Sequence, residues 1–147
     1  MKNSIVILLL GSFLSSCNFN ANVKKENDVQ DKEEAESTAG LFYLYMTNKT
    51  YDSIPKLMSN EFYKLVSEAE LKTYLINKER KLGEFKDFTL KDWKTTRTSG
   101  TNSKTEYLLI YDVTYSNAHA EESISLVKEN EKVKIFGYNV NSPDLLK

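Results

Sequence analysis

Residues 107–115 read YLLIYDVTY, and this stretch decides the fold. Successive residues of a β-strand point to opposite faces of a sheet. One face of this segment carries Tyr107, Leu109, Tyr111, Val113 and Tyr115. The other face is also apolar near its middle, and a strand with two apolar faces is typical of the centre of a sheet. We therefore predict a long central strand that is covered on each side for part of its length.

Three more segments with a period of two surround this strand. Clusters of turn-forming residues at 99–102, 117–119 and 129–131 separate the predicted strands. Their apolar positions are Phe88, Leu90 and Trp93 in the first strand, Ile124 and Leu126 in the third, and the run 133–138 in the last. Short turns between consecutive strands favour antiparallel pairing. We expect a four-stranded antiparallel meander.

Helical periodicity precedes the strands. A stripe with helical spacing predicts a helix over residues 31–46, and its members are Ala35, Ala39, Phe42, Tyr43 and Met46. Leu41, Leu44 and Tyr45 widen this stripe, so we expect the helix to be buried on more than one side. Short helices are expected near residues 53–58 and 59–65.

The last predicted helix has the clearest boundaries. Ser67 and Glu70 have the spacing of a capping box, in which each side chain bonds to the backbone N–H of the other residue. The stripe of this helix consists of Leu71, Tyr74, Leu75, Lys78 and Leu82. Gly83 follows where a C-terminal cap with positive φ is favoured. The spacing predicts a helix that ends at Leu82.

Helices followed by strands indicate an α+β domain in which N-terminal helices pack on a curved four-stranded antiparallel meander sheet. The helix order, the Tyr51-Asp52 step, residues 81–86 and the strand segments 111–115 and 132–138 resemble the NTF2-like (cystatin-like) superfamily. The resemblance covers roughly residues 33–142 and is greatest to small envelope proteins and lipoproteins of unknown function. It implies a sheet that curls around the first helix, and it includes no catalytic signature.

The N-terminus has the pattern of a lipoprotein signal peptide. Lys2 precedes an apolar stretch that is too short to form a permanent membrane span. The stretch ends in Leu14-Ser15-Ser16-Cys17, which resembles the bacterial lipobox. We expect cleavage after residue 16 and lipidation of the Cys17 thiol, which is nucleophilic as a thiolate. The alternative is a free thiol beside an ordinary signal-peptide cleavage site.

These features predict three regions. Residues 1–16 are the cleaved signal peptide, residues 17–33 are the lipidated cysteine and a polar tether, and residues 34–147 are the folded domain. We expect the protein in the bacterial cell envelope, anchored by lipid. Asn18 after the lipidated residue is similar to outer-membrane sorting signals, which predicts an outer-membrane location facing the periplasm or the cell surface.

Composition excludes several classes of function. The 147 residues suffice for one domain, and 20 basic and 21 acidic residues are mixed along the chain. No basic patch for nucleic acid is visible. One cysteine and one histidine provide neither a disulfide nor the usual ligand set of a metal site. The chain contains no phosphate-binding motif, and we expect no cofactor.

Asp112 is the one candidate catalytic residue. Some NTF2-like enzymes place an acidic residue and a tyrosine in a cavity to move protons beside a carbonyl, and Asp112 shares a strand face with Leu108 and Ile110. The simpler interpretation places Asp112 on the outer face or beside a lysine. His119 falls in a predicted turn and is interpreted as an exposed residue. The alternating tyrosines of the central strand are interpreted as core packing rather than as a ligand site.

The sequence leaves three functions open. The favoured one is a non-enzymatic, membrane-anchored domain that binds a small apolar ligand or an envelope protein. The second is an isomerase or dehydratase that uses Asp112 and a cavity tyrosine. The third is a periplasmic immunity or inhibitor protein. A deep, closed cavity that contains Asp112 would favour the enzyme, whereas an exposed hydrophobic face would favour binding.

Overall fold

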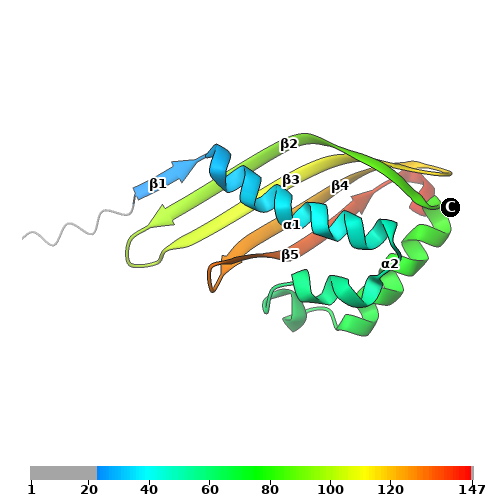
Figure 1. Cartoon of the computed structure of the whole chain (residues 1–147), viewed down its shortest axis with the longest axis horizontal. Helices are drawn as coiled ribbons and strands as arrows, with labels where there is room; N and C mark the ends of the chain where they lie inside the picture. The colour runs from blue at the N-terminus through cyan, green and yellow to red at the C-terminus, as the bar shows by residue number, and fades with distance from the viewer. Residues whose placement is uncertain (1–22, 147) are drawn as a thin grey trace, which may run out of the picture.

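The computed structural model describes residues 23–146 of the chain. The predicted signal peptide and Cys17 lie outside the described residues. The described part is an α+β fold in which helices pack on one antiparallel sheet (Figure 1). Helices α1 (Val29–Thr47) and α2 (Glu68–Leu82) and the short helices η1 (Tyr51–Leu57) and η2 (Phe62–Lys64) precede the main strands, and η3 (Pro143–Leu146) ends the described part.

Within residues 23–146 the sheet has five strands in sequence order, all antiparallel. The strands are β1 (Val23–Glu26), β2 (Phe85–Ser99), β3 (Lys104–Tyr115), β4 (His119–Glu129) and β5 (Lys132–Asn141). The predicted meander is confirmed as β2 to β5. The expected number of four strands is wrong, because the short polar segment Val23–Glu26 pairs with the outer end of β2.

This N-terminal strand also changes the domain boundary. The expected tether of residues 17–33 includes β1 and the start of α1, so residues 23–33 belong to the folded domain. Asp28 caps α1 by accepting hydrogen bonds from the backbone N–H groups of Gln30 and Asp31. Asp31 is fully buried and forms an ion pair with Arg97 of β2. Polar residues therefore fix this segment by caps and ion pairs, which apolar periodicity does not detect.

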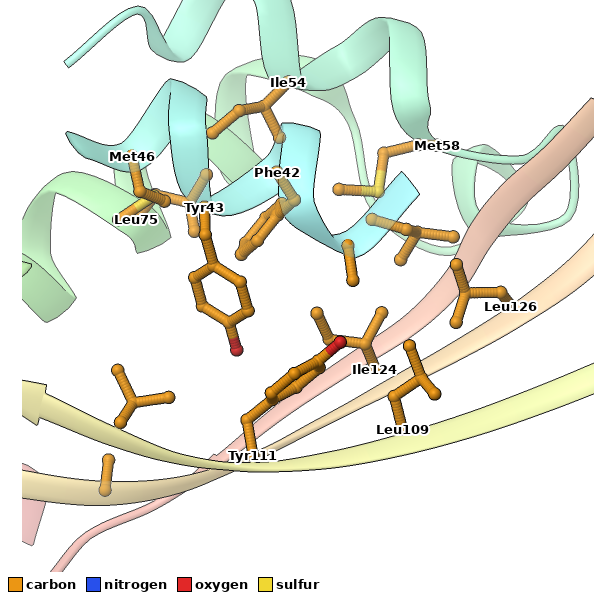
Figure 2. Packing of buried hydrophobic residues seen from close by; sticks show 14 of the residues in the cluster. Phe42, Tyr43, Met46, Ile54, Met58, Leu75, Leu109, Tyr111, Ile124 and Leu126 are labelled. Carbon is orange, nitrogen blue, oxygen red and sulfur yellow. The ribbon is translucent and has the colours of Figure 1, made fainter. Parts of the chain in front are cut away.

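Helix α1 lies along the concave face of the sheet (Figure 1). All five residues of its predicted stripe are buried: Ala35, Ala39, Phe42, Tyr43 and Met46. Leu41 and Leu44 are exposed, so the expected burial on more than one side is wrong for these two positions. Figure 2 shows Tyr43 pointing from α1 toward the sheet and Tyr111 rising from β3 to meet it. Their rings make an edge contact with centroids 5.3 Å apart.

The core fills the space between α1 and the sheet. Its central apolar residues include Phe42, Ile54, Leu75, Leu109 and Ile124, each fully excluded from solvent (Figure 2). Tyr107, Tyr111 and Tyr115 are also buried, which confirms their interpretation as core packing. The outer side of β3 is less covered than expected, since Leu108 and Ile110 are only half-buried.

Helix α2 has the predicted caps. The Ser67 hydroxyl accepts from the Glu70 backbone N–H, and the Glu70 side chain accepts from the Ser67 backbone N–H, which forms the capping box. Gly83 ends the helix with a φ of 90°. A Cβ at this position would lie 2.1 Å from Ser116 Oγ and 2.9 Å from Asn117 N. Gly83 is therefore required both by its backbone conformation and by the close approach of the next hairpin.

Candidate functional site

An apolar pocket opens between η2, α2 and β5, at the edge of the sheet where the strand order ends. Its volume is about 340 Å³, which is at the lower end of the range for small-molecule sites. Its apolar and aromatic lining consists of Phe62, Leu65, Val66, Leu71, Tyr74 and Tyr138. Leu65 is 85% exposed at this site. Exposed apolar side chains around a concave surface are typical of a binding site.

Backbone contacts hold one wall of the pocket against β5. Met58 forms an isolated parallel bridge with Ile135, and the backbone N–H of Ser59 donates to the Ile135 carbonyl at 2.8 Å. Ser59 is fully buried, and its hydroxyl accepts from the backbone N–H of Phe62 at 3.1 Å. The start of η2 is thus fixed to the sheet, although η2 itself is short.

Tyr138 reaches the pocket because β5 is irregular. Ser125 pairs with Gly137 but Leu126 pairs with Ile135, so one extra residue of β5 lies between these pairs. This bulge places both Ile135 and Tyr138 against the helices, since the extra residue breaks the alternation of faces. The ring of Tyr138 packs on Phe42, with centroids 5.0 Å apart, and meets the edge of Tyr74 at 6.2 Å.

A buried polar network lies behind Tyr138, and Glu122 is at its centre. Glu122 accepts hydrogen bonds from the hydroxyls of Tyr43 at 3.1 Å, Tyr138 at 2.6 Å and Tyr115. The Lys78 ammonium donates to Glu122 Oε1 at 3.2 Å and to the Tyr138 hydroxyl at 2.5 Å. The side chains of Lys78 and Glu122 are both 0% exposed. Each carboxylate oxygen therefore accepts two hydrogen bonds, and the charge is paired.

Burial controls the ionisation of this network. Desolvation lowers the pKa of Lys78, although the neighbouring Glu122 opposes that shift. Desolvation raises the pKa of Tyr43, Tyr115 and Tyr138, and the Glu122 charge raises it further. The tyrosines thus remain neutral donors to the carboxylate at physiological pH. The Lys78 ammonium also lies 5.1 Å from the ring centres of Tyr115 and Tyr138, a favourable cation–π distance.

The sequence contains a signal for this network, namely two charged residues at positions where the periodicity of the strand and the helix predicts buried side chains. Glu122 alternates with Ile124 and Leu126 on the buried face of β4, and Lys78 lies on the apolar stripe of α2. Two opposite charges at core positions predict a buried ion pair, because a lone buried charge is costly. The interpretation of the alternating tyrosines as core packing does not identify the Tyr115 hydroxyl as a donor to Glu122.

The structure separates Asp112 and His119 from the pocket. The side chain of Asp112 is 64% exposed, and its carboxylate lies 3.7 Å from Lys91 Nζ. This is the position that the outer-face interpretation predicts. His119 is exposed and begins β4, with Nδ1 3.3 Å from the Thr114 hydroxyl. Neither residue lines the apolar pocket, but both line a separate open hollow of about 370 Å³, together with Lys91 and Glu121.

Two further observations concern residues 23–146, and a third concerns the chain as a whole. No group of three or more acidic, histidine or cysteine side chains in this part could hold a metal ion. No helix in the same region combines the length and the apolar character that a membrane span requires. In comparisons with known proteins, the chain matches no protein-family model, no curated protein and no solved structure.

Proposed function

We propose that this protein is a lipid-anchored protein of the bacterial cell envelope whose NTF2-like domain binds a small apolar ligand without catalysis. The pocket between η2, α2 and β5 carries this proposal. Its lining is apolar and aromatic and includes exposed apolar side chains, and it has the volume of a small ligand. The order of helices and antiparallel strands supports the NTF2-like assignment.

The position of Asp112 favours binding over the isomerase or dehydratase alternative. A general base needs a pocket that holds the substrate within hydrogen-bond reach. Asp112 is 64% exposed beside Lys91 and lines, with His119, a separate and more open hollow that lies away from the apolar pocket. The buried carboxylate of Glu122 is fully occupied by three tyrosine hydroxyls and Lys78. We therefore interpret the network as the support for Tyr138 at the pocket.

Titration with a hydrophobic fluorescent probe tests the binding function. We expect N-phenyl-1-naphthylamine to become fluorescent on residues 17–147 carrying Cys17→Ser, which keeps every described residue. Leu65→Ser should weaken the binding several-fold without unfolding the domain, because Leu65 is largely exposed. Leu44→Ser changes an equally apolar exposed residue on α1, outside the pocket, and is the matched control. Equal probe affinity in the two variants would reject the pocket as the site.

The anchor has a separate test. Cells that express the full chain should incorporate a fatty-acid analogue into the protein, and Cys17→Ser should abolish the label and release the protein from membranes. Persistent labelling of the Cys17→Ser variant would contradict lipidation at this residue. Failure of the lipidation test would not change the interpretation of the probe titration, because the pocket lies entirely within residues 62–138.

A further inference from the structure

The pocket combines three aromatic rings with a single charged residue. Phe62, Tyr74 and Tyr138 supply the rings, and Glu70 is the one charged side chain that lines the pocket. The negative faces of aromatic rings attract cations, and organic ammonium groups are bound by such rings in other proteins. An apolar lining with a carboxylate at its rim is complementary to an organic cation rather than to a fatty acid.

Glu70 is held in place as a charged acceptor. Its Oε2 accepts from the Ser67 backbone N–H at 2.8 Å and from the Ser67 hydroxyl at 2.7 Å. These hydrogen bonds lower the pKa of Glu70, so the carboxylate is ionised at neutral pH. Within residues 23–146, Oε1 accepts no hydrogen bond and Glu70 forms no ion pair. The capping box thus orients the carboxylate and leaves one oxygen available.

Tyr138 also offers only an acceptor. A tyrosine hydroxyl has one hydrogen to donate and two lone pairs. The hydrogen of Tyr138 is donated to Glu122, and one lone pair accepts from Lys78. Any ligand group that reaches this hydroxyl must therefore donate a hydrogen bond to it. A carboxylate, which only accepts, has no partner at Tyr138 or at Glu70.

The nearby positive charges are already neutralised. Lys78 is buried behind Tyr138 and is paired with Glu122. Lys64 of η2 is paired with Glu61 at 2.5 Å. The partial positive charge at the N-terminus of α2 is met by Glu68 and Glu70 in the first turn. Glu70 is thus the unneutralised charge in direct contact with the pocket.

We propose that the pocket selects an apolar organic cation, an alkyl- or arylammonium compound, and that Glu70 with the rings of Phe62, Tyr74 and Tyr138 provides this selectivity. The inference rests on the proposed function, because it assumes that the pocket binds a small ligand. It adds the charge and the hydrogen-bonding character of that ligand.

A pair of isosteric compounds tests the selectivity. Trimethyl(4-hydroxyphenyl)ammonium and 4-tert-butylphenol have the same shape and differ in one positive charge. Calorimetry with residues 17–147 carrying Cys17→Ser should show about fivefold or greater preference for the cation. Added salt should reduce the affinity for the cation and leave that for the neutral compound unchanged. Amide NMR shifts of residues 65–74 should locate both compounds.

Glu70→Gln is the decisive variant because glutamine also forms a capping box, so the fold is kept while the charge is removed. It should weaken binding of the cation several-fold and leave binding of 4-tert-butylphenol unchanged. Glu68→Gln, which lies in the same helical turn but outside the pocket, should change neither. Equal affinity for the two compounds, or binding of the naphthylamine probe without the cation, would overturn the selectivity. Failure of all three ligands would instead reject the proposed function.

Discussion

Lys78 and Glu122 form an ion pair inside the core, with Nζ 3.2 Å from Oε1 and both side chains excluded from solvent. The pair joins α2 to β4, two elements that are 44 residues apart at these positions. A buried pair of this kind rarely adds net stability, but loss of one partner leaves an uncompensated charge. The pair therefore links the position of α2 to that of the sheet.

A double-mutant cycle measures this relationship. Lys78→Met alone should destabilise the fold by about 3–5 kcal/mol, because Glu122 stays buried without its cation. Adding Glu122→Gln should recover more than about 1 kcal/mol of that loss in urea denaturation. The exposed pair of Lys91 and Glu121 is the matched control, and its coupling should stay below about 0.5 kcal/mol. Additive losses at Lys78 and Glu122 would contradict the coupling.

Alkaline pH should unfold the domain steeply. Burial raises the pKa of eight tyrosines, namely Tyr43, Tyr51, Tyr63, Tyr74, Tyr107, Tyr111, Tyr115 and Tyr138. These groups hold protons in the folded state that the unfolded chain loses above about pH 10. The stability is therefore complete below pH 10 and falls above it, by up to about 1.4 kcal/mol per pH unit for each buried tyrosine and by less for Tyr74, which is 42% exposed.

Lys78 opposes this trend. Because its pKa is lowered in the folded state, stability rises with pH below the pKa that Lys78 has in the unfolded chain. This is the effect of one lysine against that of eight tyrosines. Denaturation midpoints between pH 8 and 11.5, with tyrosinate absorbance followed in parallel, provide the measurement. Tyrosinate should appear together with unfolding. Ionisation of most tyrosines in the folded protein would show that their hydroxyls are accessible.

Two glycines should respond in opposite ways to alanine. Gly83→Ala should destabilise the domain by more than about 1 kcal/mol, because its φ is 90° and a Cβ would collide with Ser116 and Asn117. Gly40 lies within α1, and a Cβ there meets nothing within 4 Å. Gly40→Ala should therefore stabilise the domain by about 0.5–1 kcal/mol. Thermal denaturation of both variants tests the assignment, and equal effects would contradict it.

Removal of the N-terminal strand should destabilise the fold. A chain that begins at Glu33 lacks β1, the Asp28 cap and the ion pair of Asp31 with Arg97, whereas a chain that begins at Val23 keeps them. We expect a loss of about 2 kcal/mol or more in urea denaturation for the shorter chain. Identical midpoints for the two chains would restore the sequence-based boundary at residue 34.

Asp112→Asn should have little effect. The side chain is largely exposed, and the ion pair that it forms among residues 23–146 is the 3.7 Å contact with Lys91. We expect a change of less than about 0.5 kcal/mol and parallel curves of stability against pH from 4 to 9. Divergence of the curves at high pH would show that Asp112 is buried in solution.

The parts of the fold that depend on apolar periodicity were predictable. The stripe of α1, the capping box at Ser67 and the meander from β2 to β5 all follow from repeating patterns and local capping chemistry. The segment Val23–Glu26 could not be recognised as a strand, because it has only one apolar residue and is fixed by pairing with a distant part of β2.

The candidate site was less predictable for a related reason. Its floor depends on the bulge before Tyr138, and a single extra residue in β5 leaves no mark in the composition. Glu70 was identified for its role in capping, and nothing in the sequence shows that the same carboxylate lines a pocket. Glu122 and Lys78 were detectable from their core positions, but only once both charges are considered together.

The pairing of Val23 with Ser99 shortens the segment that can link the domain to a lipid anchor. If lipid is attached at Cys17, only residues 18–22 separate it from the first strand. A fully extended chain of this length covers about 20 Å. The domain would then stay within a thin layer at the bilayer surface. A ligand in free solution would have to diffuse into that layer before the pocket could bind it. A force applied to the anchor would act first on β1 and on the hydrogen bonds between β1 and β2. The edge of the sheet would therefore bear the force before any helix.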